Sequence, residues 1–162
     1  MLKKVLILCT GNSCRSIIAE ALINSQFEGK VIAYSSGVSA SGKVNPNAKK
    51  ILQAKNIWSD DYHSKVIESV MHLSFDLVVT VCENANQTCP VFPGNTPVVH
   101  LGFDDPDGEG YEAFEICFEE IKNKLLPVIQ TLVLKDKPKK NSTPKKKVIK
   151  KNLIYGHFLC QL

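Results

Sequence analysis

The sequence predicts one α/β domain built on a four-stranded parallel sheet with helices on both faces. Its 162 residues correspond to a single domain of ordinary size. Short apolar runs alternate along the chain with segments of helical period, an alternation that is typical of parallel sheets. No apolar run reaches the length of about 18 residues that a transmembrane helix requires. We therefore expect a sheet whose ligands bind at the carboxyl ends of its strands.

The first half of the chain begins with a strand and a helix. Residues 3–8 form the continuous apolar run of a buried strand, and residues 17–27 carry apolar side chains at helical spacing. A second, short strand is expected at residues 31–34. Pro46 marks the next helix start, because proline is favoured at the first helical position, and the apolar stripe that follows consists of Ala48, Ile51 and Leu52. A further helical stretch is expected at about residues 66–73.

The second half supplies two more strands and a long helix. Residues 76–81 are the most strand-like segment of the chain, and residues 97–101 hold the fourth strand. Two segments that contain Pro and Gly, residues 83–96 and 102–110, are expected to be loops. The long amphipathic helix comes last, with one apolar face made of Phe114, Cys117, Phe118, Ile121 and Leu125.

The net charge of +4 is divided unevenly along the chain. Residues 135–162 contain nine Lys and one Asp, whereas residues 1–134 contain eleven basic and fifteen acidic side chains. We expect residues 1–134 to form the folded domain and residues 135–162 to form a basic, disordered tail. A tail of this charge raises the alternative of a module that binds nucleic acid or anionic lipid. We expect neither partner, because the Lys-rich segment lacks the stacking platform of single-strand binders.

The first nine residues resemble an export signal only superficially. Just four apolar residues separate Lys4 from Cys9, fewer than the roughly 7–15 of a signal peptide, so we interpret the segment as a buried strand. Six Cys without an export signal favour free thiols over a disulfide framework. The sequence therefore predicts a cytoplasmic protein.

An eight-residue loop after the first strand has the composition of an oxyanion cradle. Backbone N–H groups turned inward at a helix N-terminus bind tetrahedral anions, and Gly and Asn tolerate the left-handed conformations that such a nest needs. An arginine can add two hydrogen bonds to the anion. The same field is expected to lower the pKa of the first cysteine and make it a nucleophile. The loop consists of Cys9, Thr10, Gly11, Asn12, Ser13, Cys14, Arg15 and Ser16.

A second pair of cysteines follows the third predicted strand. Six residues separate Cys82 from Cys89, and the two thiols can form a disulfide once the loop bends. Zinc binding is an alternative, but the spacing is not the usual one and no His pair lies at ligand spacing. Two ordinary free thiols are the other alternative. We expect no metal.

The cradle resembles that of the low-molecular-weight protein tyrosine phosphatase superfamily, which includes phosphatases and arsenate reductases. Around the later cysteines the chain is similar to the arsenate reductases that thioredoxin or a related thiol donor reduces. Two residues differ from the phosphatase branch, which usually has Pro where this chain has Ile17 and an aromatic residue where it has Asp107. The similar stretches are residues 34–37, 45–48, 76–82, 89–90 and 100–106, and the likeness covers about residues 1–134.

The resemblance implies reduction of arsenate to arsenite by a relay of three thiols. Cys9 attacks arsenic, Cys82 attacks the sulfur of the adduct, and Cys89 moves the disulfide into a loop that an external thioredoxin or glutaredoxin reduces. Asp105 is the expected proton donor because it precedes Pro106, and Asp104 is the reserve. The alternative is a phosphotyrosine phosphatase that works through a phosphorylated Cys9. A slow phosphatase activity is expected as a side reaction of the reductase.

No cofactor is expected. Some relatives bind potassium beside the cradle through Asn, Glu, Ser and Asp, and the first three correspond to Asn12, Glu20 and Ser35. The position of the Asp falls at Lys65, whose ammonium group would repel the ion. The remaining thiols are expected to be bystanders: Cys14 as part of the cradle wall, Cys117 in the core and Cys160 in the tail.

Overall fold

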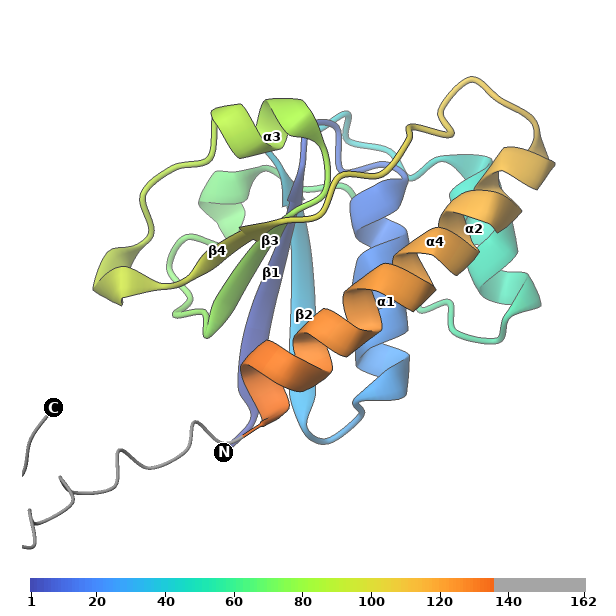
Figure 1. Ribbon diagram of the computed structural model, residues 1–162. Coiled ribbons are helices and arrows are strands. Elements are labelled where there is room, and N and C mark those ends of the chain that lie inside the picture. The colour runs from blue at the N-terminus through green and yellow to red at the C-terminus, as the bar shows by residue number, and fades with distance from the viewer. Residues whose placement is uncertain (136–162) are drawn as a thin grey trace, which may run out of the picture.

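A computed structural model describes residues 1–135; the predicted tail beyond them, with Cys160, lies outside the described residues. The described part alternates strands and helices in the predicted order (Figure 1). The strands are β1 (Lys3–Cys9), β2 (Val31–Gly37), β3 (Leu77–Thr80) and β4 (Val98–His100). The α-helices are α1 (Arg15–Gln26), α2 (Pro46–Ala54), α3 (Glu83–Gln87) and α4 (Tyr111–Ile129), and the shorter helical turns are η1 (Ile67–Ser69), η2 (Pro93–Asn95) and η3 (Gln130–Leu134).

The four strands form one parallel sheet in the order β2-β1-β3-β4, which confirms the predicted fold class. The central strand β1 is the apolar run of the sequence, and its residues Val5 to Leu8 are completely buried. Strands buried on both faces have such continuous apolar runs. Because the strands are parallel, the segments that follow Cys9, Gly37 and Thr80 meet at one edge of the sheet.

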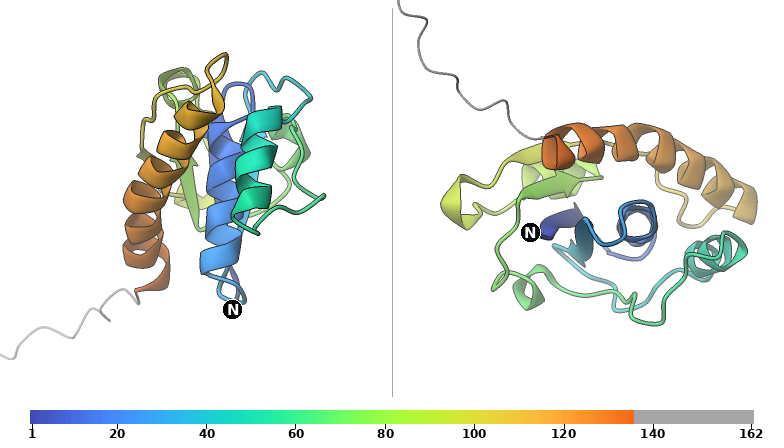
Figure 2. Two further views of the ribbon diagram at one scale, coloured as in Figure 1. Left: turned by 90° about the vertical axis from the view of Figure 1, so that its right-hand side faces the viewer. Right: turned by 90° about the horizontal axis from the view of Figure 1, so that it is seen from below.

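Three long helices pack together beside the sheet. Helix α1 packs on β1 and β2, and α4 and α2 both contact it, so that the three lie side by side (Figure 2). The apolar face predicted for the last helix is the buried face of α4, with Phe114, Ile121 and Leu125 fully enclosed. Burial of a large aliphatic or aromatic side chain contributes about 1.5–3 kcal/mol. This face therefore anchors α4 against α1.

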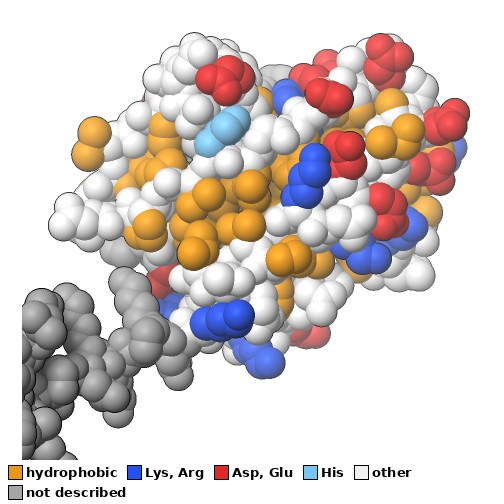
Figure 3. All heavy atoms as spheres, in the orientation of Figure 1, with side chains coloured by type: hydrophobic (Ala, Val, Ile, Leu, Met, Phe, Trp, Pro, Cys, Tyr) orange, Lys and Arg blue, Asp and Glu red, His pale blue; other side chains and the backbone are white. Residues whose placement is uncertain are grey.

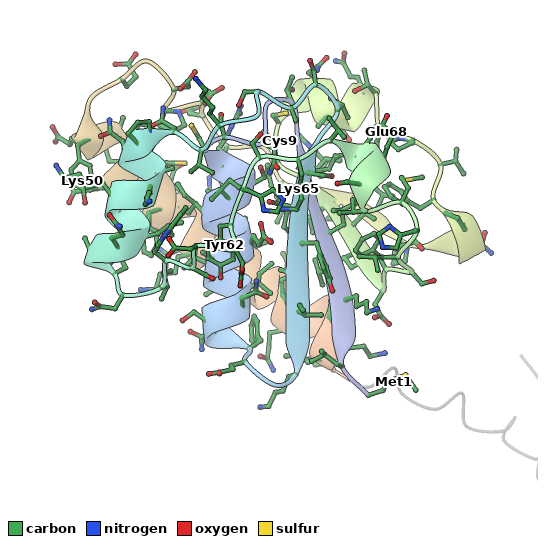
Figure 4. All side chains as sticks on the ribbon, turned by 180° about the vertical axis from the view of Figure 1, so that it is seen from behind. Met1, Cys9, Lys50, Tyr62, Lys65 and Glu68 are labelled. Atoms are coloured by element: carbon green, nitrogen blue, oxygen red, sulfur yellow. The ribbon has the colours of Figure 1, made fainter. Side chains whose placement is uncertain are left out.

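The other face of the sheet is covered by the connection between α2 and β3. This connection includes η1 and lies toward the viewer in Figure 4, which shows the molecule from behind. Phe75 packs edge to face on Tyr34 of β2, with ring centroids 5.9 Å apart, and on Phe92 at 6.4 Å. Helical elements thus lie on both faces of the sheet: the helices α1, α2 and α4 on one face and the short turn η1 on the other.

Two predicted segments differ in the structure. The helix expected at residues 66–73 is reduced to the 3-10 turn η1, because Val66 is extended and forms a parallel bridge with Gly37. The loop expected at residues 83–96 contains α3 and η2, two elements too short to leave a periodic pattern in the sequence. Among residues 1–135, no helix has both the length and the apolar character needed to cross a membrane.

Candidate active site

The oxyanion loop predicted at residues 9–16 joins the end of β1 to the start of α1. Asn12 adopts a left-handed conformation with φ 49°, whereas Gly11, where the same conformation is expected, does not adopt it. Backbone N–H groups of residues 38–45 bind the carbonyl oxygens of the loop from outside, at Cys9, Thr10, Gly11 and Ser13. Because these carbonyls are held by outside donors, the N–H groups of the loop remain as the donors for an anion.

Gly37, the last residue of β2, makes this close packing possible. A Cβ atom at this position would collide with the carbonyl oxygen of Thr10. The backbone that follows Gly37 runs directly against the loop, where Val38 N donates to Cys9 O at 3.0 Å. Only glycine permits this approach of the two chains.

A buried polar network lies on the inner side of the loop. The Asn12 side chain is completely buried; its Nδ2 donates to the hydroxyls of Ser16 and Ser35, both at 2.9 Å, and its Oδ1 accepts from the backbone N of Lys65 at 2.8 Å. The Ser35 hydroxyl in turn donates to Glu20. The network holds Asn12 by every hydrogen-bonding group of its side chain, and so fixes the loop conformation.

The negative end of this network is paired with a lysine. Lys65 Nζ lies 3.7 Å from Glu20 Oε2 and donates to His63 O at 3.1 Å. Burial raises the pKa of Glu20, and the charge of Lys65 opposes that rise. Figure 4 labels Lys65 and Cys9 at the same end of the sheet, where the cradle lies. An ammonium group of the chain itself therefore balances the Glu20 carboxylate.

Arg15 connects the cradle to the predicted acid loop at residues 102–110. Its Nη1 donates to Phe103 O at 2.9 Å, and its Nη2 lies 2.7 Å from Asp105 Oδ2. The sequence predicts that Arg15 donates two hydrogen bonds to an anion. In the structure its Nη1 and Nη2 bind the acid loop instead. The remaining donor, Nε, is buried without a protein partner. A buried donor of this kind is satisfied when an oxyanion accepts its hydrogen bond.

Of the two adjacent carboxylates, Asp105 is the one that the structure ties to the cradle. Besides its contact with Arg15, its Oδ1 accepts from the backbone N of Asp107 at 3.2 Å. Asp104, the reserve candidate, has no comparable contact among the described residues. The geometry therefore favours Asp105 as the carboxyl group beside a bound anion.

The thiols of Cys9 and Cys82 lie close together although the two residues are far apart in the sequence. Cys82 ends the segment after β3, caps α3, and lies 3.2 Å from Thr10 Oγ1. Both thiols are buried, at 4% and 6% exposure. Two thiols this close, beside an oxyanion loop, can be joined by a disulfide after a small movement.

The contact between the two thiols also controls their ionisation. The hydrogen bond from Cys9 lowers the pKa of Cys82 to about 5, with help from Thr10 and from the backbone of Ala85. The same contact, together with burial, raises the pKa of Cys9, although Arg15 acts to lower it. In this conformation the pKa of Cys9 is raised and not lowered as expected, because Cys82 competes with it for the negative charge. The pair shares one proton.

Cys89 lies apart from this pair. It is partly buried, its Sγ approaches Pro90 O at 3.7 Å, and burial raises its pKa. Helix α3 separates it from Cys82 along the chain. The five cysteines of the described part, Cys9, Cys14, Cys82, Cys89 and Cys117, are all free.

Cys14 and Cys117 occupy the positions expected of bystanders. Cys14 is buried in the cradle wall, where it accepts a hydrogen bond from Ser13 Oγ, and burial raises its pKa to about 12. Cys117 lies in the core on the buried face of α4, and burial raises its pKa to about 11.

Of three further residues at the site, Asn84 has no signal in the sequence, and Asn45 and Asp107 are marked there only by the resemblance. Asn84 Nδ2 donates to Thr10 Oγ1 at 3.1 Å and thereby orients the hydroxyl that faces Cys82. Asn45 and Asp107 bond to each other at the rim, at 2.7 Å. Among residues 1–135 no group of three or more His, Cys, Asp or Glu side chains is arranged to hold a metal ion.

Comparison with known proteins agrees with this geometry. The chain matches the low molecular weight phosphotyrosine protein phosphatase family over residues 4–139. An arsenate reductase of Bacillus cereus (strain G9842) is 44% identical over 119 residues, which cover 74% of this chain and 88% of that protein. A solved arsenate reductase from Archaeoglobus fulgidus superposes with a TM-score of 0.67 at 29% identity, covering 77% of this chain and 98% of that one.

A second solved structure, an arsenate reductase in the phosphate binding state, also has a TM-score of 0.67, at 27% identity, and covers 80% of this chain and 98% of that one. The family match spans the cradle, the Cys82 segment and the acid loop. The fold and the sequence thus lead to the same assignment. The chain belongs to the low-molecular-weight phosphotyrosine protein phosphatase family and is a relative of the arsenate reductases within it.

Proposed function

We propose that this protein reduces arsenate to arsenite through a relay of Cys9, Cys82 and Cys89. The observation that carries the proposal is the Cys82 thiol beside Cys9, with Thr10 Oγ1 3.2 Å from its sulfur. Ester hydrolysis by a cysteine phosphatase needs one nucleophilic thiol, whereas reduction of arsenic(V) needs a second thiol to form a disulfide. The names of the relatives, arsenate reductases, support the same reaction.

In the first step arsenate binds to the N–H groups of the cradle and to Arg15 Nε. Cys9 loses its proton, for which the neighbouring Cys82 thiolate is the acceptor, and its sulfur attacks arsenic. A sulfur–arsenic bond forms while an arsenic–oxygen bond breaks, and Asp105 protonates the oxygen that leaves as water. Arsenic is still in the +5 state after this step.

In the second step Cys82 returns its proton to solvent and attacks the sulfur of Cys9. The Cys9–Cys82 disulfide forms, the sulfur–arsenic bond breaks, and its electron pair stays on arsenic. Arsenic(V) is thereby reduced to arsenite, and two thiols are oxidised to one disulfide. Helix α3 starts directly after Cys82, so the attacking sulfur lies at its N-terminus, where the field favours the thiolate.

In the third step Cys89 attacks Cys82 and releases Cys9. Seven residues of helical backbone span about 10 Å, more than the roughly 4.4–6.8 Å between the Cα atoms of a disulfide, so α3 must unwind. The resulting Cys82–Cys89 disulfide lies in a surface loop, where an external dithiol of the thioredoxin or glutaredoxin type reduces it. A relay of free thiols requires a reducing compartment, and we propose the cytoplasm.

We propose that catalysis is independent of potassium. The Lys65 ammonium, 3.7 Å from Glu20 Oε2, already neutralises the carboxylate that would attract the ion. The residues present therefore do not fit a bound potassium ion, even though Asn12, Glu20 and Ser35 lie together. Replacing sodium with potassium at constant ionic strength should leave kcat/KM for arsenate unchanged, and a several-fold increase would contradict the proposal.

The experiment that tests the proposed function compares two activities in the same variants. Wild-type protein and Cys82→Ser are assayed for arsenate turnover coupled to thioredoxin and its reductase, and for hydrolysis of an aryl phosphate. Cys82→Ser should abolish arsenate turnover, because the reduction needs a second thiol to form a disulfide. It should keep the hydrolysis, because without Cys82 the field of Arg15 and the loop amides favours the thiolate of Cys9. Cys117→Ala is the matched control, since it removes a thiol that lies in the core outside the relay.

A phosphotyrosine phosphatase that works through a phosphorylated Cys9 is the second candidate, and the cradle with Asp105 supports it. If the wild type hydrolyses aryl phosphates efficiently and shows no arsenate turnover with thioredoxin or glutaredoxin, the protein is a phosphatase and the proposed relay is wrong. The two assays run side by side separate these outcomes.

A further inference from the structure

The imidazole of His100, at the end of β4, connects the sheet to helix α3. Its Nδ1 lies 2.9 Å from Thr80 Oγ1, at the end of β3, and its Nε2 lies 3.4 Å from Glu83 Oε2, at the start of α3. The Thr80 hydroxyl also donates to Asn86 Oδ1 at 3.5 Å. His100 thus contacts α3 directly at Glu83 and through Thr80 at Asn86. We call these four residues the α3 latch.

The position of the imidazole is set by the sheet. Thr80 and His100 are register partners in the parallel strands β3 and β4, so their side chains lie on the same face. The Thr80 side chain is completely buried there. Gly102 leaves room for the ring, because a Cβ atom at that position would lie 3.1 Å from His100 Nε2. The sheet therefore holds one side of the latch in place, and α3 supplies the other.

Helix α3 depends on such contacts because it is only five residues long. Isolated helices shorter than about 12–15 residues are marginal in water, so a helix of this length is held by tertiary contacts. Three contacts hold it: the fully buried side chain of Ala85, the hydrogen bond of Asn84 to the cradle, and the α3 latch. Each of them raises the free energy that unwinding of α3 requires.

The latch differs from the Asn84 contact in where it ends. Asn84 Nδ2 donates to Thr10 Oγ1, the hydroxyl that faces Cys82, so a change at Asn84 also alters the cradle. The contacts of His100 end on β3 and on α3. The latch can therefore be removed without touching the oxyanion loop.

We propose that His100, through the α3 latch, holds α3 wound and thereby sets the equilibrium between the two free thiols of Cys82 and Cys89 and their disulfide. The inference rests on the proposed function, which gives this disulfide its place in the relay. A wound α3 keeps the two sulfurs apart, so the latch favours the free thiols. His100 is a positioning residue: it acts through Glu83 and Thr80 and exchanges no proton or electron with the substrate.

The test measures this equilibrium without arsenate. Full-length protein that carries Cys9→Ser in every sample, so that Cys9 cannot compete for Cys82, is equilibrated with mixtures of reduced and oxidised glutathione. Oxidised glutathione takes two electrons and two protons from Cys82 and Cys89 and becomes two molecules of reduced glutathione, while the Cys82–Cys89 bond forms. Alkylation and peptide mapping by mass spectrometry then give the oxidised fraction, and hence the equilibrium constant.

Two variants open the latch from opposite sides. The equilibrium constant for disulfide formation should rise about threefold in Glu83→Ala and about tenfold in His100→Ala, which loses both contacts. The double variant should match His100→Ala, because Glu83 acts only through the imidazole. Glu83 is 65% exposed, so its replacement leaves the fold intact, and urea unfolding verifies this for every variant. His72→Ala is the matched control, since it removes an exposed imidazole outside the latch.

Three results would overturn the proposal. The first is an equilibrium constant that stays at the starting value in Glu83→Ala and His100→Ala, or that rises equally in His72→Ala. The second is a further rise when Glu83→Ala is added to His100→Ala, which would show that Glu83 acts on α3 without His100. The third is the absence of a Cys82–Cys89 disulfide at every glutathione ratio. Failure of the proposed function would appear separately, as missing arsenate turnover in the wild type.

Discussion

At the scale of single residues, the chemistry depends on one proton shared by two thiols. Cys9 sits in the field of Arg15 and of the loop amides, which favours its thiolate, yet the neighbouring sulfur of Cys82 competes for the same charge. A buried pair of this kind carries one negative charge more easily than two. Either thiol can therefore carry the negative charge, and the proton moves from Cys9 to Cys82 when the substrate binds.

The ultraviolet absorbance of thiolates should reveal this shared charge. The pKa of Cys82 is lowered to about 5, chiefly by the hydrogen bond from Cys9, whereas an ordinary Cys titrates near 8.5. One thiolate signal should therefore persist at neutral pH and disappear as the pH falls through about 5. In Cys9→Ala the midpoint should move upward because the donor is gone, and in Cys82→Ser the signal should come from Cys9, which no longer competes with a second thiol for the charge. A wild-type signal that appears only above neutral pH would contradict the shared proton.

At the scale of elements, α4 holds the acid loop near the cradle. The helix starts at Tyr111, directly after that loop, and packs on α1, which starts at Arg15. The buried face of α4 therefore determines where Asp105 lies relative to the anion site. Stability and catalytic geometry depend on the same packing.

Two isoleucines of α4 provide a matched test of this packing. Ile121 is completely buried and Ile116 is 58% exposed. Ile121→Ala should lower the free energy of unfolding by about 2–5 kcal/mol, because it leaves a cavity in the core. Ile116→Ala should change it by less than about 0.5 kcal/mol. Urea unfolding measures both, and equal effects of the two substitutions would contradict the packing described for α4.

The elements differ in how well the sequence predicts them. Strands β1 and β3 and helix α4 are predictable because their apolar patterns are long and regular. The helix expected near residue 66 was wrong because Val66 pairs with Gly37, a tertiary contact that overrides local preference. Helix α3 escaped prediction because five residues are too few to show a helical period.

At the scale of the whole molecule, the topology assembles a site from segments that are distant in sequence. All residues of the cradle come from one continuous stretch of eight residues, so the cradle could be predicted from the sequence. Its partners could not, because Asn45, Lys65, Asn84 and Asp107 come from four separate connections that meet only when the sheet forms. None of them carries a motif of its own, and the resemblance alone pointed to Lys65, to Asp107 and to the stretch that begins at Asn45.

The surface charge of the whole molecule is unevenly distributed. Acidic side chains gather over the N-terminal half of α4 and the segment before it (Figure 3), where Glu112, Glu115, Glu119 and Glu120 lie. The attraction for an anion therefore comes from the loop amides and Arg15, at short range. The nine Lys of residues 135–162 should contribute little to it.

Truncation after Leu134 tests this division of the chain. The cradle, the relay cysteines and the acid loop all lie in residues 1–134, so the shortened protein should keep kcat/KM for arsenate within about twofold. Steady-state turnover at low and moderate salt provides the measurement. A loss of tenfold or more would mean that residues 135–162 take part in the site.

Peptide mapping of a single turnover tests the central claim most directly. Fully reduced protein is mixed with one equivalent of arsenate in the absence of any thiol donor, quenched with an alkylating reagent, and analysed by mass spectrometry. The relay predicts one arsenite per protein and a Cys82–Cys89 disulfide, with Cys9, Cys14 and Cys117 alkylated; Cys89→Ser should stop at a Cys9–Cys82 disulfide. Arsenite release without a disulfide between these cysteines, or no arsenate-dependent oxidation at all, would contradict the account.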